Sequence, residues 1–129
     1  MRWHKTTLRV VNRTKGTVIG DAIRVADSEL TRIVGLLGER RLLPGDGLLI
    51  VPSQGVHTVG MLFPIDVVVL DGEWNVVAVR RELRPCRMTR FFWKAAAVLE
   101  LPAGIIDSTG TLVGDSLEFV RAGAAQAGT

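Results

Sequence analysis

A chain of 129 residues fits one domain of ordinary size, which can bury a hydrophobic core without the help of a metal or a disulfide. The hydrophobic fraction of 47% excludes a disordered chain, and one cysteine beside two histidines excludes an internal disulfide and leaves too few ligands for structural zinc. The net charge of +3 is mild, but residues 1–16 and 80–94 are strongly basic, which fits an anionic partner or a solvated face. No apolar stretch has the length of a signal peptide or a membrane span, so we expect a cytoplasmic protein with no membrane partner.

The first two predicted strands form a hairpin. Residues 8–12 and 17–26 are rich in apolar, β-prone side chains. The four residues between them end in Gly16, which suits a tight turn. We therefore expect these two strands to pair with each other.

One amphipathic helix is predicted after this hairpin. Asp27 or Ser28 can cap its first turn, and Gly38 can end it in a left-handed conformation. Its apolar side chains fall at the i, i+3, i+4 and i+7 spacing of one helical face, and they are Leu30, Ile33, Val34 and Leu37.

Short strands are predicted after residue 47. Apolar runs follow one another too closely for strand–helix–strand units, which favours antiparallel pairing. Asp71 and Gly72 predict a hairpin turn into a strand at 76–79, and Pro85 is expected to interrupt the continuation of that strand. The runs before this turn are 48–51, 56–63 and 65–71.

The C-terminal third combines one ambiguous segment with clearer ones. Alanines favour a helix in residues 95–101, but the apolar residues before Pro102 favour a buried strand, so we predict a strand for the second half. A helical turn at 103–109 and a last strand at 116–120 follow. We expect residues 1–121 to form a single β-rich domain and residues 122–129 to form a disordered tail.

Several of these segments together resemble a known family. Residues 56–71, with the sequence VHTVGMLFPIDVVVLD, resemble the core signature of domain-of-unknown-function family 192, and the resemblance extends from about Asp21 to Val120. It implies a mostly β fold, a small antiparallel β-barrel or sandwich with one amphipathic helix packed on one side, and no established activity. The other matching stretches, in the family's order, are 32–40, 47–50, 98–104 and 114–115.

His57 and Asp66 are candidate functional residues. His57 precedes Asp66 by nine residues, so a hairpin could bring the two together, and a histidine held by a carboxylate is a usable general base. If the strand continues instead, His57 is a structural residue. Asp66 interrupts an apolar run, where an unpaired carboxylate would be costly. Arg40 or the backbone is its expected partner, and a ligand is the alternative.

Glu100 is a single acid between Leu99 and Leu101. Alternation could place it on the solvent face of a half-buried strand. If Glu100, Asp66 and His57 converged, they could bind a divalent cation, but their spacing does not require it. We therefore predict neither a metal nor a cofactor.

Residues 80–94 alternate cations with aromatic rings. Single-stranded nucleic acid is bound by this combination, because cations contact phosphates and rings stack on bases. The same segment could be a strand and a loop whose rings turn inward. Its basic side chains, the candidate polyanion-binding set, are Arg80, Arg81, Arg84, Arg87, Arg90 and Lys94.

These observations support three hypotheses about function. The leading one is a non-catalytic module that binds a small ligand or a protein partner in a groove bordered by His57, Asp66, Arg40 and Glu100. The first alternative is nucleic-acid or polyanion binding through residues 80–94. The second is a small enzyme that uses His57 and Asp66. Oligomeric state cannot be read from the sequence.

Overall fold

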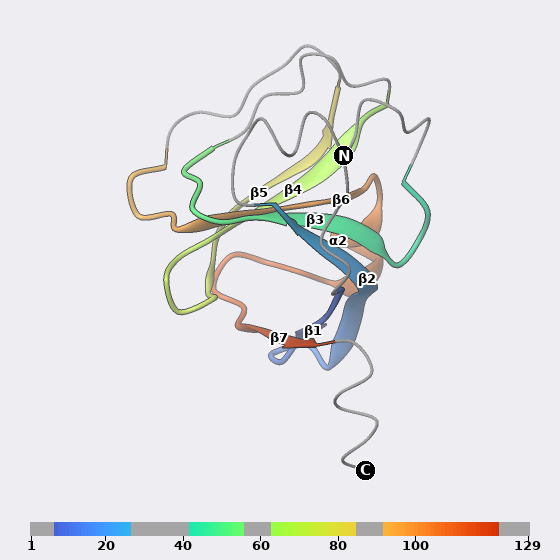
Figure 1. The fold of residues 1–129 in the computed structure, drawn as a ribbon, viewed down its shortest axis with the longest axis horizontal. Coiled ribbons are helices and arrows are strands. Elements are labelled where there is room, and N and C mark those ends of the chain that lie inside the picture. The colour runs from blue at the N-terminus through green and yellow to red at the C-terminus, as the bar shows by residue number, and fades with distance from the viewer. Residues whose placement is uncertain (1–6, 27–41, 56–62, 85–91, 122–129) are drawn as a thin grey trace.

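A computed structural model describes residues 7–26, 42–55, 63–84 and 92–121 (Figure 1). The described residues form seven strands and one short helix. In chain order these are β1 (Leu8–Asn12), β2 (Thr17–Ala26), β3 (Asp46–Ile50), β4 (Ile65–Leu70), β5 (Val76–Leu83), β6 (Ala97–Pro102), α2 (Ile105–Thr109) and β7 (Leu117–Arg121).

All seven strands belong to one sheet, in the order β5-β4-β6-β3-β2-β1-β7. The sheet curls so that β1, β2 and β7 face back under the other strands, which gives a half-barrel (Figure 1). Its two ends meet near the start of β5, where the Val76 N–H donates to the Asp115 carbonyl at 2.8 Å and the Leu117 N–H donates to the Trp74 carbonyl at 3.0 Å. The mostly β class predicted from the sequence is confirmed.

Local turn signals led to correct predictions. The β1–β2 hairpin turns at residues 13–16, and the β4–β5 hairpin follows Asp71. The predicted helical turn forms at α2, and the second half of 95–101 is a strand. The predicted amphipathic helix, most of the apolar run at 56–63 and the C-terminal tail lie outside the described residues.

One strand pair corrects the antiparallel prediction. β2 and β3 are parallel, with Ile23 opposite Gly47 and Val25 opposite Leu49. A tight turn cannot join parallel neighbours, because the chain must return to the same end of the sheet before the second strand begins. The spacing of apolar runs contains no information about which strand pairs with β3.

Strands β4 and β6 are buried on both faces along their whole length. Their nearly continuous apolar sequences are typical of such strands, whereas a half-buried strand alternates apolar and polar residues. The inner core, inside the curl, contains Val10, Ile19, Ile23, Val68, Leu70, Leu99, Leu101, Ile106 and Leu117 among its residues. The outer core, on the other face, contains Ala26, Leu48, Ile50, Ile65, Val67, Val69 and Val98 among its residues.

Within the described residues, no helix is both long enough and apolar enough to cross a membrane.

Candidate functional site

Asp66 is fully buried on β4, and backbone donors engage both of its carboxylate oxygens. The Glu82 N–H donates to Oδ1 at 2.9 Å. The N–H groups of Gly104 and Ile106 donate to Oδ2 at 3.1 and 2.8 Å. Charge-assisted bonds of this kind are strong, so Asp66 joins the end of β5 to the start of α2.

The local backbone explains why Asp66 is needed there. The β4–β5 register shifts between Ile65 and Val67, and Glu82 opposite this shift has a φ of 51° in the left-handed region. Gly104, the N-cap of α2, has a φ of 99° and no side chain to cap the helix. The carboxylate therefore accepts hydrogen bonds from N–H groups that have no backbone partner in the β4–β5 ladder or in α2. The expected backbone partner is present, and Arg40 lies outside the described residues.

Glu100 is also fully buried, which contradicts the solvent-facing alternative that alternation allowed. It lies opposite Val67 on β4 and Leu48 on β3, whereas Asp66 lies opposite Leu101. Residues directly opposite in a ladder share a face, so Glu100 belongs to the outer core and Asp66 to the inner core.

This register separates the two candidate carboxylates by the thickness of the sheet. Asp66 and Glu100 therefore cannot bind the same cation. Among the residues that the structure describes, no group of three or more histidine, cysteine, aspartate or glutamate side chains could hold a metal ion. His57 lies outside those residues, so its place near either carboxylate stays a prediction.

The described part of segment 80–94 divides into two groups. The Arg80 guanidinium lies 5.3 Å from the centre of the Phe92 ring, and the Lys94 ammonium lies 5.3 Å from the centre of the Trp93 ring. Both distances are within the range of cation–π attraction. We call these four residues, Arg80, Phe92, Trp93 and Lys94, the aromatic–basic surface.

Arg81 points elsewhere. Its Nε donates to Oδ1 of Asp107 on α2 at 2.7 Å, and both side chains are largely exposed. Arg84 follows β5 as an exposed residue. Arg87 and Arg90 lie outside the described residues. The structure thus brings Arg80 and Lys94 to the aromatic rings and Arg81 to the helix.

The turn that carries the aromatic rings is fixed by Gln54. The Phe92 N–H donates to the Gln54 carbonyl at 2.9 Å, and the Gln54 side-chain amide donates to the Trp93 carbonyl at 3.1 Å. The Ala95 N–H closes the turn on the Phe92 carbonyl at 2.9 Å. Hydrogen bonds to Gln54 and within the turn therefore fix the backbone that carries both rings.

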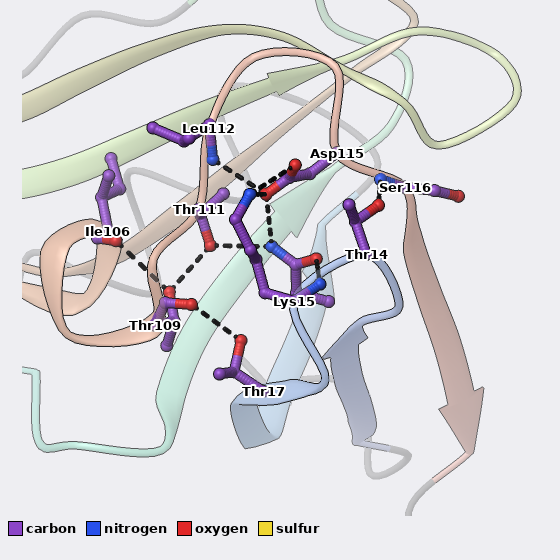
Figure 2. A network of polar contacts seen from close by, with 10 residues as sticks. Thr14, Lys15, Thr17, Ile106, Thr109, Thr111, Leu112, Asp115 and Ser116 are labelled. Atoms are coloured by element: carbon purple, nitrogen blue, oxygen red, sulfur yellow. Dashed lines mark hydrogen bonds and ion pairs between the residues drawn. The ribbon is translucent and has the colours of Figure 1, made fainter.

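A buried polar network, which the sequence did not predict, lies at the end where the half-barrel closes. The Lys15 ammonium contacts both carboxylate oxygens of Asp115 at 2.8 Å (Figure 2). The Asn12 amide donates to Asp115 at 2.9 Å and to the Thr111 hydroxyl at 3.2 Å. A further bond at 2.7 Å links the hydroxyls of Thr111 and Thr109.

This network lowers the pKa of Asp115. Burial alone would raise the pKa of the carboxyl, but hydrogen bonds from Lys15, Asn12 and the Leu112 N–H, with the charge of Lys15, outweigh it. The network joins the β1–β2 turn to the segment before β7, about a hundred positions away in the chain. Its donors and acceptors satisfy one another, so we interpret it as a structural clasp.

The curled sheet with α2 packed against β2 and β4 defines a class of small, mostly antiparallel β domains. A crystal structure from Sinorhizobium meliloti 1021, provisionally described as a transcription regulator, matches it with a TM-score of 0.76 at 21% identity, over 92% of this chain and 96% of that one. A protein of unknown function from Novosphingobium aromaticivorans matches with a TM-score of 0.76 at 19% identity, over 91% of each chain. At these identities the likeness shows the fold alone.

The chain belongs to domain-of-unknown-function family 192, described as an uncharacterized ACR, whose model matches residues 10–119. It is 31% identical over 118 residues to a UPF0127 protein of Thermococcus sibiricus, covering 85% of this chain and 73% of the relative. It is 32% identical over 118 residues to a UPF0127 protein of Pyrococcus furiosus, covering 87% of this chain and 98% of the relative. The family resemblance noted in the sequence is confirmed.

Proposed function

We propose that this chain is a non-catalytic binding module that holds a polyanionic partner on its aromatic–basic surface. The observation that carries the proposal is the position of Trp93, which is 74% exposed on a turn fixed by hydrogen bonds and has the Lys94 ammonium over its ring. Tryptophan side chains are highly buried on average, so an indole that is mostly in water is unusual. A partner that covers the ring accounts for its position.

The charges around this surface favour an anionic partner. Arg80 and Lys94 lie beside the rings, and Arg84 is exposed just after β5. Arg81 is paired with Asp107 on α2 and lies apart from this surface. Electrostatic attraction of this kind is independent of sequence and depends strongly on salt.

The burial of Asp66 argues for this surface over the groove that the sequence suggested. A general base or a ligand contact must reach its target, and Asp66 is fully buried with both oxygens engaged. Glu100 faces the other side of the sheet. A groove bordered by His57 and Arg40 stays a prediction, because both residues lie outside the described part of the chain.

Binding of a labelled thymidine oligonucleotide of about 20 nucleotides, followed by fluorescence anisotropy, tests the proposal. We expect the affinity to fall between about 50 and 200 mM salt, with a log–log slope of about −0.7 for each phosphate neutralised. Charge reversal in the R80E/K94E double variant should weaken binding and reduce that slope. The variant R121E, on an exposed residue of β7 at the opposite edge of the sheet, is the matched control and should change neither.

Inorganic polyphosphate serves as a second probe, because it has the charge of a polyanion without bases. If neither the oligonucleotide nor polyphosphate binds, or if binding is insensitive to salt, the proposed function is wrong.

A further inference from the structure

The two described rings of the aromatic–basic surface differ in what they contact. Phe92 is half-buried, packs against the outer core and lies beside the Arg80 guanidinium. Trp93, the next residue, is 74% exposed. Phe92 therefore serves as an anchor for the turn, and Trp93 is the ring that a partner can reach.

Hydrogen bonds hold the backbone at Trp93 before any partner binds. The Trp93 carbonyl accepts a hydrogen bond from the Gln54 side chain at 3.1 Å, and the residues on each side of the turn are bonded to each other at 2.9 Å. Only the two side-chain torsions of the indole remain to be ordered when it stacks on a ligand, which is a small cost for so large a ring. Lys94 is exposed beside the same ring, so its ammonium can contact a ligand that stacks on the indole.

We infer that Trp93 is the specificity-determining residue of this surface and that it stacks on an unpaired base of single-stranded nucleic acid, with the Lys94 ammonium contacting the adjacent phosphate. The inference rests on the proposed function and deepens it, because charge alone would accept any polyanion. A stacking ring adds a contact that only a ligand with a free planar group can make.

A duplex meets this requirement poorly. Its bases are already stacked and paired, so an indole on the protein surface reaches their faces only if the duplex opens. Polyphosphate offers charge but no ring. Single-stranded DNA, duplex DNA and polyphosphate therefore form a graded set of probes that separates the contribution of the ring from that of the cations.

Affinities of the full chain and of two Trp93 variants for these three probes test the inference. W93A should weaken oligothymidine binding on the order of tenfold, as expected for the loss of one stacked base, and W93F should recover part of the loss. Polyphosphate binding should change by less than about twofold, because it depends on charge alone.

Tryptophan fluorescence gives an independent readout. Oligothymidine should quench the emission of the wild-type chain, and the quenching should disappear in W93F. The variant W74F is the control, since Trp74 is half-buried against Phe119, with ring centres 4.6 Å apart, and should leave the quenching intact.

The possible failures are distinguishable. If W93A leaves oligothymidine binding unchanged, or weakens oligothymidine and polyphosphate equally, stacking is refuted while the proposed function stands. Stacking is also refuted if duplex and single-stranded DNA bind with equal affinity and W93A weakens both equally. If vesicles of anionic phospholipid bind through Trp93 and the oligonucleotide does not compete with them, the inference is wrong and the surface attaches to a membrane instead. If no probe binds, the inference fails together with the proposed function.

Discussion

The carboxylates of Asp66 and Glu100 lie on opposite faces of one sheet, although they come from adjacent strands. Asp66 is opposite Leu101 and Glu100 is opposite Val67, so one acid enters each hydrophobic core. Two buried acids placed in this way cannot act on one substrate or bind one cation. For Asp66 the hydrogen bonds show a structural role, and this role leads to the first prediction.

Replacing Asp66 by asparagine should destabilise the protein on the order of 3 kcal/mol, because three buried N–H groups lose a charged acceptor. Urea denaturation measures this change in the free energy of unfolding. The matched control is D107N, which removes only an exposed ion pair with Arg81 and should cost less than about 1 kcal/mol. Equal costs for D66N and D107N would show that the three hydrogen bonds contribute little.

Stability should fall in acid, partly through Asp115. Its pKa in the folded state lies below the ordinary value of 3.8, so its contribution is complete above that value and is lost as the pH falls through the lowered pKa. D115N should be less stable than the wild type at neutral pH and should lose less on acidification to about pH 3. Thermal unfolding across this range is the measurement, and parallel curves for the two proteins would contradict the prediction.

Asp71 provides a check on that pH dependence. Burial raises the pKa of Asp71, but bonds from the backbone of Asn75 and Glu73 and from the Asn75 side chain lower it below 3.8 overall. In acid, both the wild type and D115N should therefore lose some stability through Asp71, and the substitution D71N should reduce this loss. If D71N loses as much stability in acid as the wild type does, the loss comes from other carboxyl groups.

Gly47 should not tolerate even a methyl group. A Cβ there would lie 2.6 Å from Cδ1 of Ile23 and 2.9 Å from the Glu100 carbonyl, which is backbone and cannot rotate away. G47A should cost about 2 kcal/mol or more, as overpacked cores do. G72A is the matched control, because its Cβ meets nothing within 4 Å, and it should stay within about 0.5 kcal/mol of the wild type. Equal stability of the two variants would show that β3 can move outward freely.

Trp93 should contribute almost nothing to folding. W93A should change the free energy of unfolding by less than about 0.5 kcal/mol, since the ring is mostly in water. W74A, which removes a ring packed on Phe119, should cost about 2 kcal/mol. Chemical denaturation of both variants decides this, and a large loss in W93A would mean that the ring supports the fold.

Features set by neighbouring residues could be predicted from the sequence. Gly16 and the Asp71–Gly72 pair each marked a hairpin turn that forms, and the segment after Pro102 contains the expected helical turn. Such turns depend on the backbone preferences of a few consecutive residues.

Features set by distant residues could not be predicted. The parallel β2–β3 pair depends on which strand β3 meets after residues 27–45. Burial of Glu100 depends on both faces of β6 being covered, which alternation along one strand does not reveal. Likewise, the hydrogen bond between Asn12 and Asp115 joins positions separated by 103 residues, and nothing in the sequence near either residue indicates its partner.

The most direct test of the proposed binding surface is a nuclear magnetic resonance titration of the labelled full chain with oligothymidine. Amide shifts should change at residues 80–84 and 92–95 and at the side-chain amide of Gln54, with the Trp93 indole N–H among the largest changes. The closing end around Lys15 and Asp115 should stay unchanged. Changes confined to that end, or spread evenly over the molecule, would contradict binding at the aromatic–basic surface.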